Sequence, residues 1–259
     1  MLLVVDVGNT HTVLGLYDGE RLAHHWRVRT DRDRTTDEWG LTLKALFDLE
    51  DLKLDAVAAM AVSSVVPPAI HALRRAGSRY FGVEPLVVGP GVKTGLAIRY
   101  DNPREVGADR VVNAVAAFAR VRGPCIVVDF GTATTFDCIS ADGAYLGGAI
   151  APGIGIALDA LVTRATKLPR VEIARPRAAL GRTTEESMQS GVLYGYVALV
   201  DGLVERLIAE MATDTEVAVI ATGGLAGTIA AESRTIKTVD GDLTLEGLRL
   251  IHLRNQPRE

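Results

Sequence analysis

The strongest constraint on this fold is a pattern that occurs twice, once in each half of the chain. The first copy, residues 2–9, reads Leu-Leu-Val-Val-Asp-Val-Gly-Asn, and the second, residues 125–132, reads Cys-Ile-Val-Val-Asp-Phe-Gly-Thr. Each copy predicts a buried strand that ends in Asp-x-Gly, followed by a polar turn and a second β-rich run. Two buried strands ending in Asp-x-Gly can look alike by chance. A matching hairpin and third strand after each copy favour a duplication.

The periodicity between these strands predicts an α/β protein. We expect helices at 36–49, 67–80, 104–121, 154–163, 185–211 and 244–253. Two similar halves, with domain boundaries at 1–118 and 119–259, would face each other across a central cleft on which Asp6 and Asp129 converge. Thr183 and Glu186 are spaced for a capping box at the start of the longest helix.

Composition excludes several classes of protein. The chain has 259 residues, 48% of them hydrophobic, and a net charge of -4 without a basic run, so nucleic acid is not an expected partner. We expect neither a signal peptide nor a membrane span, because Asp6 follows only four apolar residues and no later run approaches about 20 apolar residues. A cytoplasmic protein with two buried, reduced thiols, Cys125 and Cys138, is the resulting expectation.

The two Asp-x-Gly turns carry groups suited to phosphate. A glycine in such a turn lets backbone N–H groups approach an oxyanion closely. Asn9, Thr10 and Thr12 add side-chain donors to the first turn, and Asp6 is suited to hold Mg²⁺ or its waters. The second turn, residues 129–135, offers the same groups. Such residues also dominate ordinary turns, so the repetition of the pattern carries the interpretation.

A third glycine-rich element is more ambiguous. Thr222-Gly223-Gly224 follows an expected strand and precedes a short helix. Small residues at this place permit close packing of a base or ribose. An ordinary strand-to-helix turn has the same composition, and both interpretations stay open.

The paired hairpins and the late Thr-Gly-Gly resemble the superfamily of acetate and sugar kinases and actin-like ATPases, whose fold consists of two duplicated ribonuclease H-like domains. Within it, residues 6–10 (Asp-Val-Gly-Asn-Thr), 107–110 (Gly-Ala-Asp-Arg) and 129–135 (Asp-Phe-Gly-Thr-Ala-Thr-Thr) are similar in order and spacing to type III pantothenate kinases. The resemblance covers essentially the whole chain. It implies ATP-dependent phosphorylation of the primary hydroxyl of pantothenate to 4'-phosphopantothenate, the first step of coenzyme A biosynthesis.

The resemblance also implies roles for individual residues. The ATP-binding set would be Asp6, Val7, Gly8, Asn9, Thr10, His11, Thr12 and Val13 from the first hairpin and Thr132 from the second. The pantothenate-binding set would be Tyr100, Gly107, Ala108, Asp109, Arg110 and Thr184, with Asp109 as catalytic base. Asp129 would bind a monovalent cation, K⁺ or NH₄⁺. ATP would carry Mg²⁺, and the enzyme would be a homodimer.

Three of these side chains have plainer alternatives. Asp109 lies early in an expected helix, where the positive end of the dipole keeps a carboxylate ionised, as a base requires. The same position suits a purely helix-stabilising acid. Arg110 offers a fork for the pantothenate carboxylate or a surface ion pair. Thr184 could contact substrate or assist capping.

Three rival functions remain at this level. Another small-molecule kinase of the superfamily is disfavoured by the Gly-Ala-Asp-Arg element at 107–110. A non-catalytic relative acting as a regulatory binding protein is disfavoured by intact Asp6, Asp109 and Asp129 and by the missing basic stripe. A chaperone-like ATPase would need a peptide-binding domain for which the chain is too short.

Overall fold

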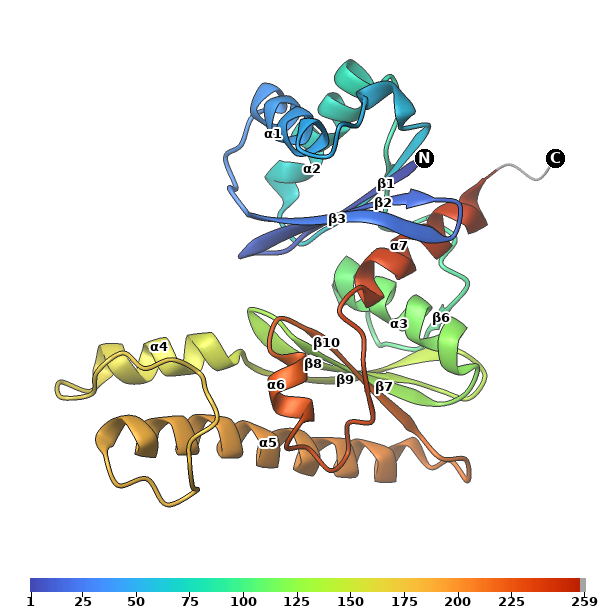
Figure 1. The fold of residues 1–259 in the computed structure, drawn as a ribbon. Coiled ribbons are helices and arrows are strands. Elements are labelled where there is room, and N and C mark those ends of the chain that lie inside the picture. Colours follow the sequence, from blue (N-terminus) through green and yellow to red (C-terminus); the bar gives the residue numbers. More distant parts are fainter. Residues whose placement is uncertain (257–259) are drawn as a thin grey trace. The chain divides into compact units, whose positions relative to one another are not determined.

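The computed structural model describes residues 1–256 and divides into two compact units. The first unit comprises Met1–Gly95, Asn102–Ala116 and, of the described residues, 243–256. The second unit comprises Leu96–Asp101 and Ala117–Asp242. Each unit is built on one β-sheet covered by helices (Figure 1).

The first sheet contains five strands in the order β3-β2-β1-β4-β5. β1 (Leu2–Val7), β2 (His11–Asp18) and β3 (Arg21–Arg29) form an antiparallel meander. β4 (Ala59–Ser64) and β5 (Leu86–Val87) then continue the sheet in parallel with β1. This order and these directions define a ribonuclease H-like arrangement.

The second sheet repeats that arrangement. β7 (Cys125–Phe130), β8 (Ala133–Ile139) and β9 (Ala144–Pro152) form the meander, and β10 (Ala218–Gly223) and β11 (Thr238–Val239) continue it in parallel with β7. A short sixth strand, β6 (Ala97–Ile98), adds to β9. The matching strand orders confirm the duplication and the predicted α/β fold. β6 and β11, each only two residues long, were not predicted.

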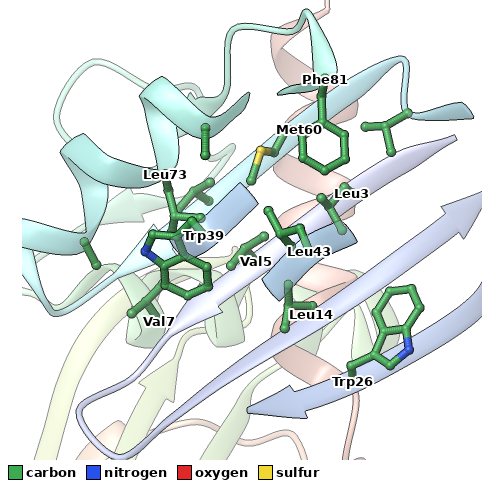
Figure 2. Packing of buried hydrophobic residues seen from close by; sticks show 14 of the residues in the cluster. Leu3, Val5, Val7, Leu14, Trp26, Trp39, Leu43, Met60, Leu73 and Phe81 are labelled. Carbon is green, nitrogen blue, oxygen red and sulfur yellow. The ribbon is translucent and has the colours of Figure 1, made fainter. Parts of the chain in front are cut away.

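Helices cover both faces of the first sheet, which explains why β1 is apolar at nearly every position. α1 (Thr36–Asp48) and α2 (Pro67–Ala76) pack on one face, where Trp39, Leu43 and Leu73 meet Leu3 and Val5 (Figure 2). α7 (Leu243–Asn255) packs on β1, β4 and β2. A Cβ atom on Gly15 would lie 3.0 Å from Leu245 of α7 and 3.1 Å from Val4, which places those side chains on the α7 face.

The second unit has its own core. α4 (Ile154–Arg164), α5 (Thr184–Met211) and α6 (Ala226–Ala230) accompany the sheet, and Phe136, Cys138, Leu193 and Val200 share one apolar cluster. The predicted burial of both cysteines is confirmed, and burial raises the pKa of the Cys125 thiol to about 12.

Only one of the two hydrogen bonds of the predicted capping box forms at α5. The Thr183 hydroxyl accepts the backbone N–H of Glu186 (3.1 Å), but the Glu186 carboxylate accepts from the N–H of Arg182 (3.0 Å) instead of Thr183. A complete capping box, which the sequence analysis did not identify, opens α1 at Thr35 and Glu38.

The compact units differ from the predicted domains at the C-terminus. The division falls inside α3 (Ala108–Val121), close to the predicted boundary at residue 118. The structure groups α7 with the first unit, whereas the predicted second domain ran to residue 259. Sequence order placed α7 in the second half, but its apolar residues Leu245 and Leu248 are buried in the first unit. The predicted helix at 104–121 also starts later, after a short 3₁₀ turn at Pro103–Glu105.

Candidate active site

The turn between β1 and β2 forms the first predicted phosphate site. The N–H of Gly8 donates to the His11 carbonyl (3.0 Å), and a Cβ atom on Gly8 would lie 3.0 Å from the same oxygen. This tight turn leaves Asn9, Thr10 and His11 exposed. These residues are accessible to an incoming polyphosphate.

The residues that flank this turn are buried and stabilise its shape. Thr12 is fully buried, and its hydroxyl lies 3.0 Å from that of Thr30, which also donates to the Gly8 carbonyl (2.8 Å). Val7 is fully buried in the core of the first unit. Their part in any site is therefore to shape the turn, and Thr30 was a supporting residue that the sequence analysis missed.

Asp6 has a partner that the sequence analysis also missed. Asp6 and Ser63 are opposite each other on the parallel strands β1 and β4, and the Ser63 hydroxyl donates to Asp6 Oδ1. Ser63 is fully buried whereas Asp6 is only partly buried. The serine thus orients one carboxylate oxygen. The sequence did contain a signal for this partner, because Ser63 and Ser64 end the otherwise apolar strand β4.

Asp109 and Arg110 begin α3 in a partly enclosed place. The backbone N–H of Arg110 donates to Asp109 Oδ1 (2.8 Å). Burial raises the pKa of the Asp109 carboxyl above its ordinary value, and this outweighs the N–H bonds and the Arg110 charge that act to lower the pKa. The desolvation cost is therefore larger than the stabilisation that these hydrogen bonds and the Arg110 charge give the ionised form. Arg110 is 9% exposed, which argues against the simple surface ion pair.

Gly107 sits directly against the Asp109 carboxylate. A Cβ atom on Gly107 would lie 2.5 Å from Asp109 Oδ1. An alanine methyl group at this position would clash only with the flexible Asp109 side chain, so the protein can relieve the clash by moving the Asp109 carboxylate. Glycine at this position therefore fixes where the carboxylate lies.

Gly107→Ala is accordingly expected to lower kcat roughly 10–100-fold, because a displacement of about 1 Å is costly at a catalytic group. Thermal unfolding should hardly change. Steady-state kinetics and a melting curve check this prediction. Gly89→Ala is the control, since a Cβ atom there meets nothing within 4 Å. Equal kcat values for both variants would contradict the positional role of Gly107.

The second turn, between β7 and β8, is framed by glycines from distant segments. Gly131 N–H donates to the Ala133 carbonyl (3.0 Å), and Thr132 is exposed. A Cβ atom on Gly153 would lie 2.7 Å from the Gly131 carbonyl oxygen. The glycine at the start of α4 thus packs directly on this turn, and only tertiary contact shows its purpose.

Gly223 makes a similar close approach to Asp129. Its φ is +91°, and a Cβ atom there would lie 2.7 Å from Asp129 Oδ1 and 2.6 Å from the Phe130 carbonyl oxygen. Gly131 would place its Cβ 3.7 Å from the same carboxylate. A half-buried carboxylate oxygen with glycines around it suits a hard cation, which prefers oxygen ligands. Within Thr222-Gly223-Gly224, Gly223 thus lies directly against the Asp129 carboxylate.

Two predicted pantothenate residues lie in the second unit. Tyr100 is 37% exposed. It belongs to a segment tied to β9 by the Arg99 N–H, which donates to the Tyr145 carbonyl (2.8 Å). Thr184 is exposed at the start of α5, where Thr183 performs the capping. The Thr184 hydroxyl is thus not needed as the cap.

Among residues 1–256, no group of three or more His, Cys, Asp or Glu side chains is placed to hold a metal ion. Within the same described part of the chain, none of the helices combines the length and apolar character that crossing a membrane requires.

Comparison with known proteins converges on one family. A family model for type III pantothenate kinase matches residues 2–206. A type III pantothenate kinase from Geobacter sulfurreducens is 59% identical over 256 residues, covering 99% of this chain and 100% of its own. One from an Anaeromyxobacter species is 58% identical with the same coverage.

A solved structure shares the fold at low identity. The activator of 2-hydroxyisocaproyl-CoA dehydratase from Clostridium difficile, with bound ADPNP, has a TM-score of 0.56 and 13% identity. The match covers 100% of this chain and 98% of that one. This likeness concerns the fold alone, which is that of the actin-like ATPases.

Proposed function

The chain belongs to the type III pantothenate kinase family, and from this membership we propose how the residues of its two units divide the reaction. The protein is an ATP-dependent kinase that phosphorylates the primary hydroxyl of pantothenate, giving 4'-phosphopantothenate, the first step of coenzyme A biosynthesis. The observation that carries the proposal is the partly enclosed Asp109 carboxylate, whose position is set by Gly107 and by the Arg110 N–H.

Asp109 acts as the base in this proposal. Phosphoryl transfer needs the substrate hydroxyl in line with the γ-phosphorus and a group that orients the hydroxyl and accepts its proton. A carboxylate with a raised pKa is a stronger proton acceptor than an ordinary aspartate. Arg110 pairs with the pantothenate carboxylate through its planar fork. Gly107, Ala108, Tyr100 and Thr184 complete the substrate contacts.

The first hairpin, Asp6 to Val13, binds the phosphates of ATP. Exposed Asn9, Thr10 and His11 provide donors, and the tight turn that Gly8 closes holds them together at the end of β1. Asp6, oriented by Ser63, holds Mg²⁺ or its waters. When bound, Mg²⁺ neutralises charge on the phosphate oxygens. Thr132 of the second hairpin also contacts ATP.

Asp129 binds a monovalent cation, K⁺ or NH₄⁺. Support comes from the carboxylate itself, an oxygen ligand that lies among the backbones of Gly223 and Gly131, where no side chain covers it from those two positions. When bound, the cation adds positive charge that favours the transition state.

The active protein is a cytoplasmic homodimer in this proposal. Support for self-association is an exposed set of apolar side chains in the second unit. These are Ile150 (67% exposed), Ile156 (50%), Leu161 (42%) and Leu180 (81%). Exposed apolar side chains of this size often mark interaction surfaces. Analytical ultracentrifugation should give twice the chain mass, and a monomer would refute this part.

The test of the proposed function is ADP release measured in a coupled assay with ATP, Mg²⁺, K⁺ and pantothenate. Turnover should require pantothenate and should collapse when Na⁺ replaces K⁺. Omission of pantothenate gives the background ATPase rate. No pantothenate-dependent turnover in any salt would refute the substrate and direct attention to other small-molecule kinase substrates or to a regulatory binding role. Turnover unaffected by Na⁺ would refute only the cation assignment.

A further inference from the structure

The second unit contains a fully buried carboxylate that belongs to none of the proposed ATP, pantothenate or cation sites. Asp137 of β8 is 0% exposed, and the hydroxyl of the equally buried Tyr145 donates to its Oδ1 (2.8 Å). The Thr135 hydroxyl donates to Oδ2 (3.3 Å). Burying an acidic side chain is costly, and apolar side chains of similar volume often stabilise a core at least as well. A carboxylate here therefore calls for a role other than stability.

A β-bulge brings the two side chains together. β8 and β9 pair Asp137 with Gly148 and Cys138 with Gly147, but the next pair is Ile139 with Tyr145, so β9 carries an extra residue. Bulges redirect side chains and recur beside active sites. Because Cys138 belongs to the apolar cluster on one face of the sheet, strand alternation places its neighbour Asp137 on the other face.

Tyr145 also adjoins Tyr100, by side chain and by backbone. The two ring centroids are 6.3 Å apart at an interplanar angle of 58°. The Tyr145 carbonyl accepts the Arg99 N–H (2.8 Å), one residue before Tyr100. Beyond the bulge, Gly147 (φ +117°) lies under Tyr100, since a Cβ atom there would be 3.3 Å from Tyr100 Cε2. The Tyr100 ring thus rests on a glycine and a tyrosine whose position Asp137 secures.

We propose that Tyr145, anchored by Asp137, is a positioning residue for Tyr100 and thereby sets how tightly the enzyme binds pantothenate. This inference rests on the proposed function, which places Tyr100 in the pantothenate pocket. Tyr145 is fully buried and acts through Tyr100. A wall that contacts the pantothenate body interacts alike with substrate and transition state, so loosening it raises KM and leaves kcat unchanged.

Tyr145→Phe tests the inference because it removes only the hydroxyl and keeps the ring. The expected result is a rise of about 3–10-fold in KM for pantothenate, with kcat and KM for ATP within about twofold. Asp137→Asn retains an oxygen acceptor for Tyr145 and should raise KM for pantothenate by a smaller factor, about threefold. Tyr80→Phe is the matched control, since Tyr80 donates to Asp37 (2.5 Å) in the first unit. It should change none of these constants.

Tyr100→Ala separates the possible outcomes. If Tyr100→Ala raises KM for pantothenate while Tyr145→Phe leaves it unchanged, the inference is overturned and the proposed function stands. If Tyr100→Ala has no effect, the placement of Tyr100 fails and the inference falls with it. A lower melting temperature for Tyr145→Phe with unchanged KM would show a purely structural role and overturn the inference. Should that variant not fold, an unchanged KM in Asp137→Asn would overturn it equally.

Discussion

Asp109→Asn is expected to lower kcat by roughly 10²–10⁴-fold, the usual contribution of a general base. The amide keeps the size of the carboxylate and an oxygen for the Arg110 N–H, which now donates to Asp109 Oδ1 (2.8 Å). It cannot accept the proton of the pantothenate hydroxyl at neutral pH. Turnover is measured by ADP release, and KM for ATP should change little. A variant with near-normal kcat would remove Asp109 from the role of base.

The same substitution should not destabilise the protein. Burial raises the pKa of Asp109 in the folded state, so its favourable contribution to stability is present below the unfolded pKa and is lost as pH rises through the folded pKa. Above its unfolded pKa this carboxyl therefore destabilises the fold, an effect that asparagine, which does not titrate, lacks. The melting temperature of Asp109→Asn at pH 7 should therefore equal or exceed that of the parent. A clear drop would mean that lost activity reflects unfolding.

The raised pKa also sets a direction for the pH profile. The base works only when deprotonated, so kcat/KM should fall as pH falls through the folded pKa of Asp109. The acid limb should therefore lie above the ordinary pKa of an aspartate. Rates measured from acid to neutral pH check this, after correction for any unfolding. An acid limb at or below the ordinary aspartate value would contradict the assignment.

Gly223→Ala is expected to damage both stability and catalysis. At φ +91° an L-residue is strained by about 1–3 kcal/mol from the backbone alone. The added Cβ would also lie 2.6 Å from the Phe130 carbonyl oxygen, which belongs to the rigid β7 backbone. The new methyl group further displaces Asp129, whose Oδ1 would be 2.7 Å away. We expect a lower midpoint in denaturant and a weakened activation by K⁺.

Gly227→Ala is the matched control, four residues further along the chain. A Cβ atom on Gly227 meets nothing within 4 Å, and the residue lies in α6. Alanine in a helix is favoured over glycine by about 0.8–1 kcal/mol, so this variant should be as stable as the parent or more so. If K⁺ stimulates the turnover of Gly223→Ala as strongly as that of the parent, Gly223 shapes only the turn and does not position Asp129.

Much of the site could be predicted from residue type and order. Asp6, Asp109 and Asp129 each stand in a short motif, and the surrounding Gly, Thr and Asn residues show that backbone and hydroxyl donors are close in the chain. Such motifs are local, so a turn and its donors can be inferred without knowing the rest of the fold. The supporting residues could not be inferred. Ser63 meets Asp6 only because strands distant in the sequence pair, and Tyr145 meets Asp137 only because a β-bulge shifts the register of the β8–β9 hairpin.

The sequence by itself determined the duplicated strand pattern, the helices between the strands and the phosphate-type turns, because periodicity and turn chemistry depend on neighbours along the chain. Only the tertiary structure decided that α7 joins the first unit, that Gly153 and Gly223 press against the second turn, and that Asp137 is buried beside Tyr145. The raised pKa of Asp109 likewise follows only from the tertiary structure. Burial comes from packing between remote segments, and no local pattern records it.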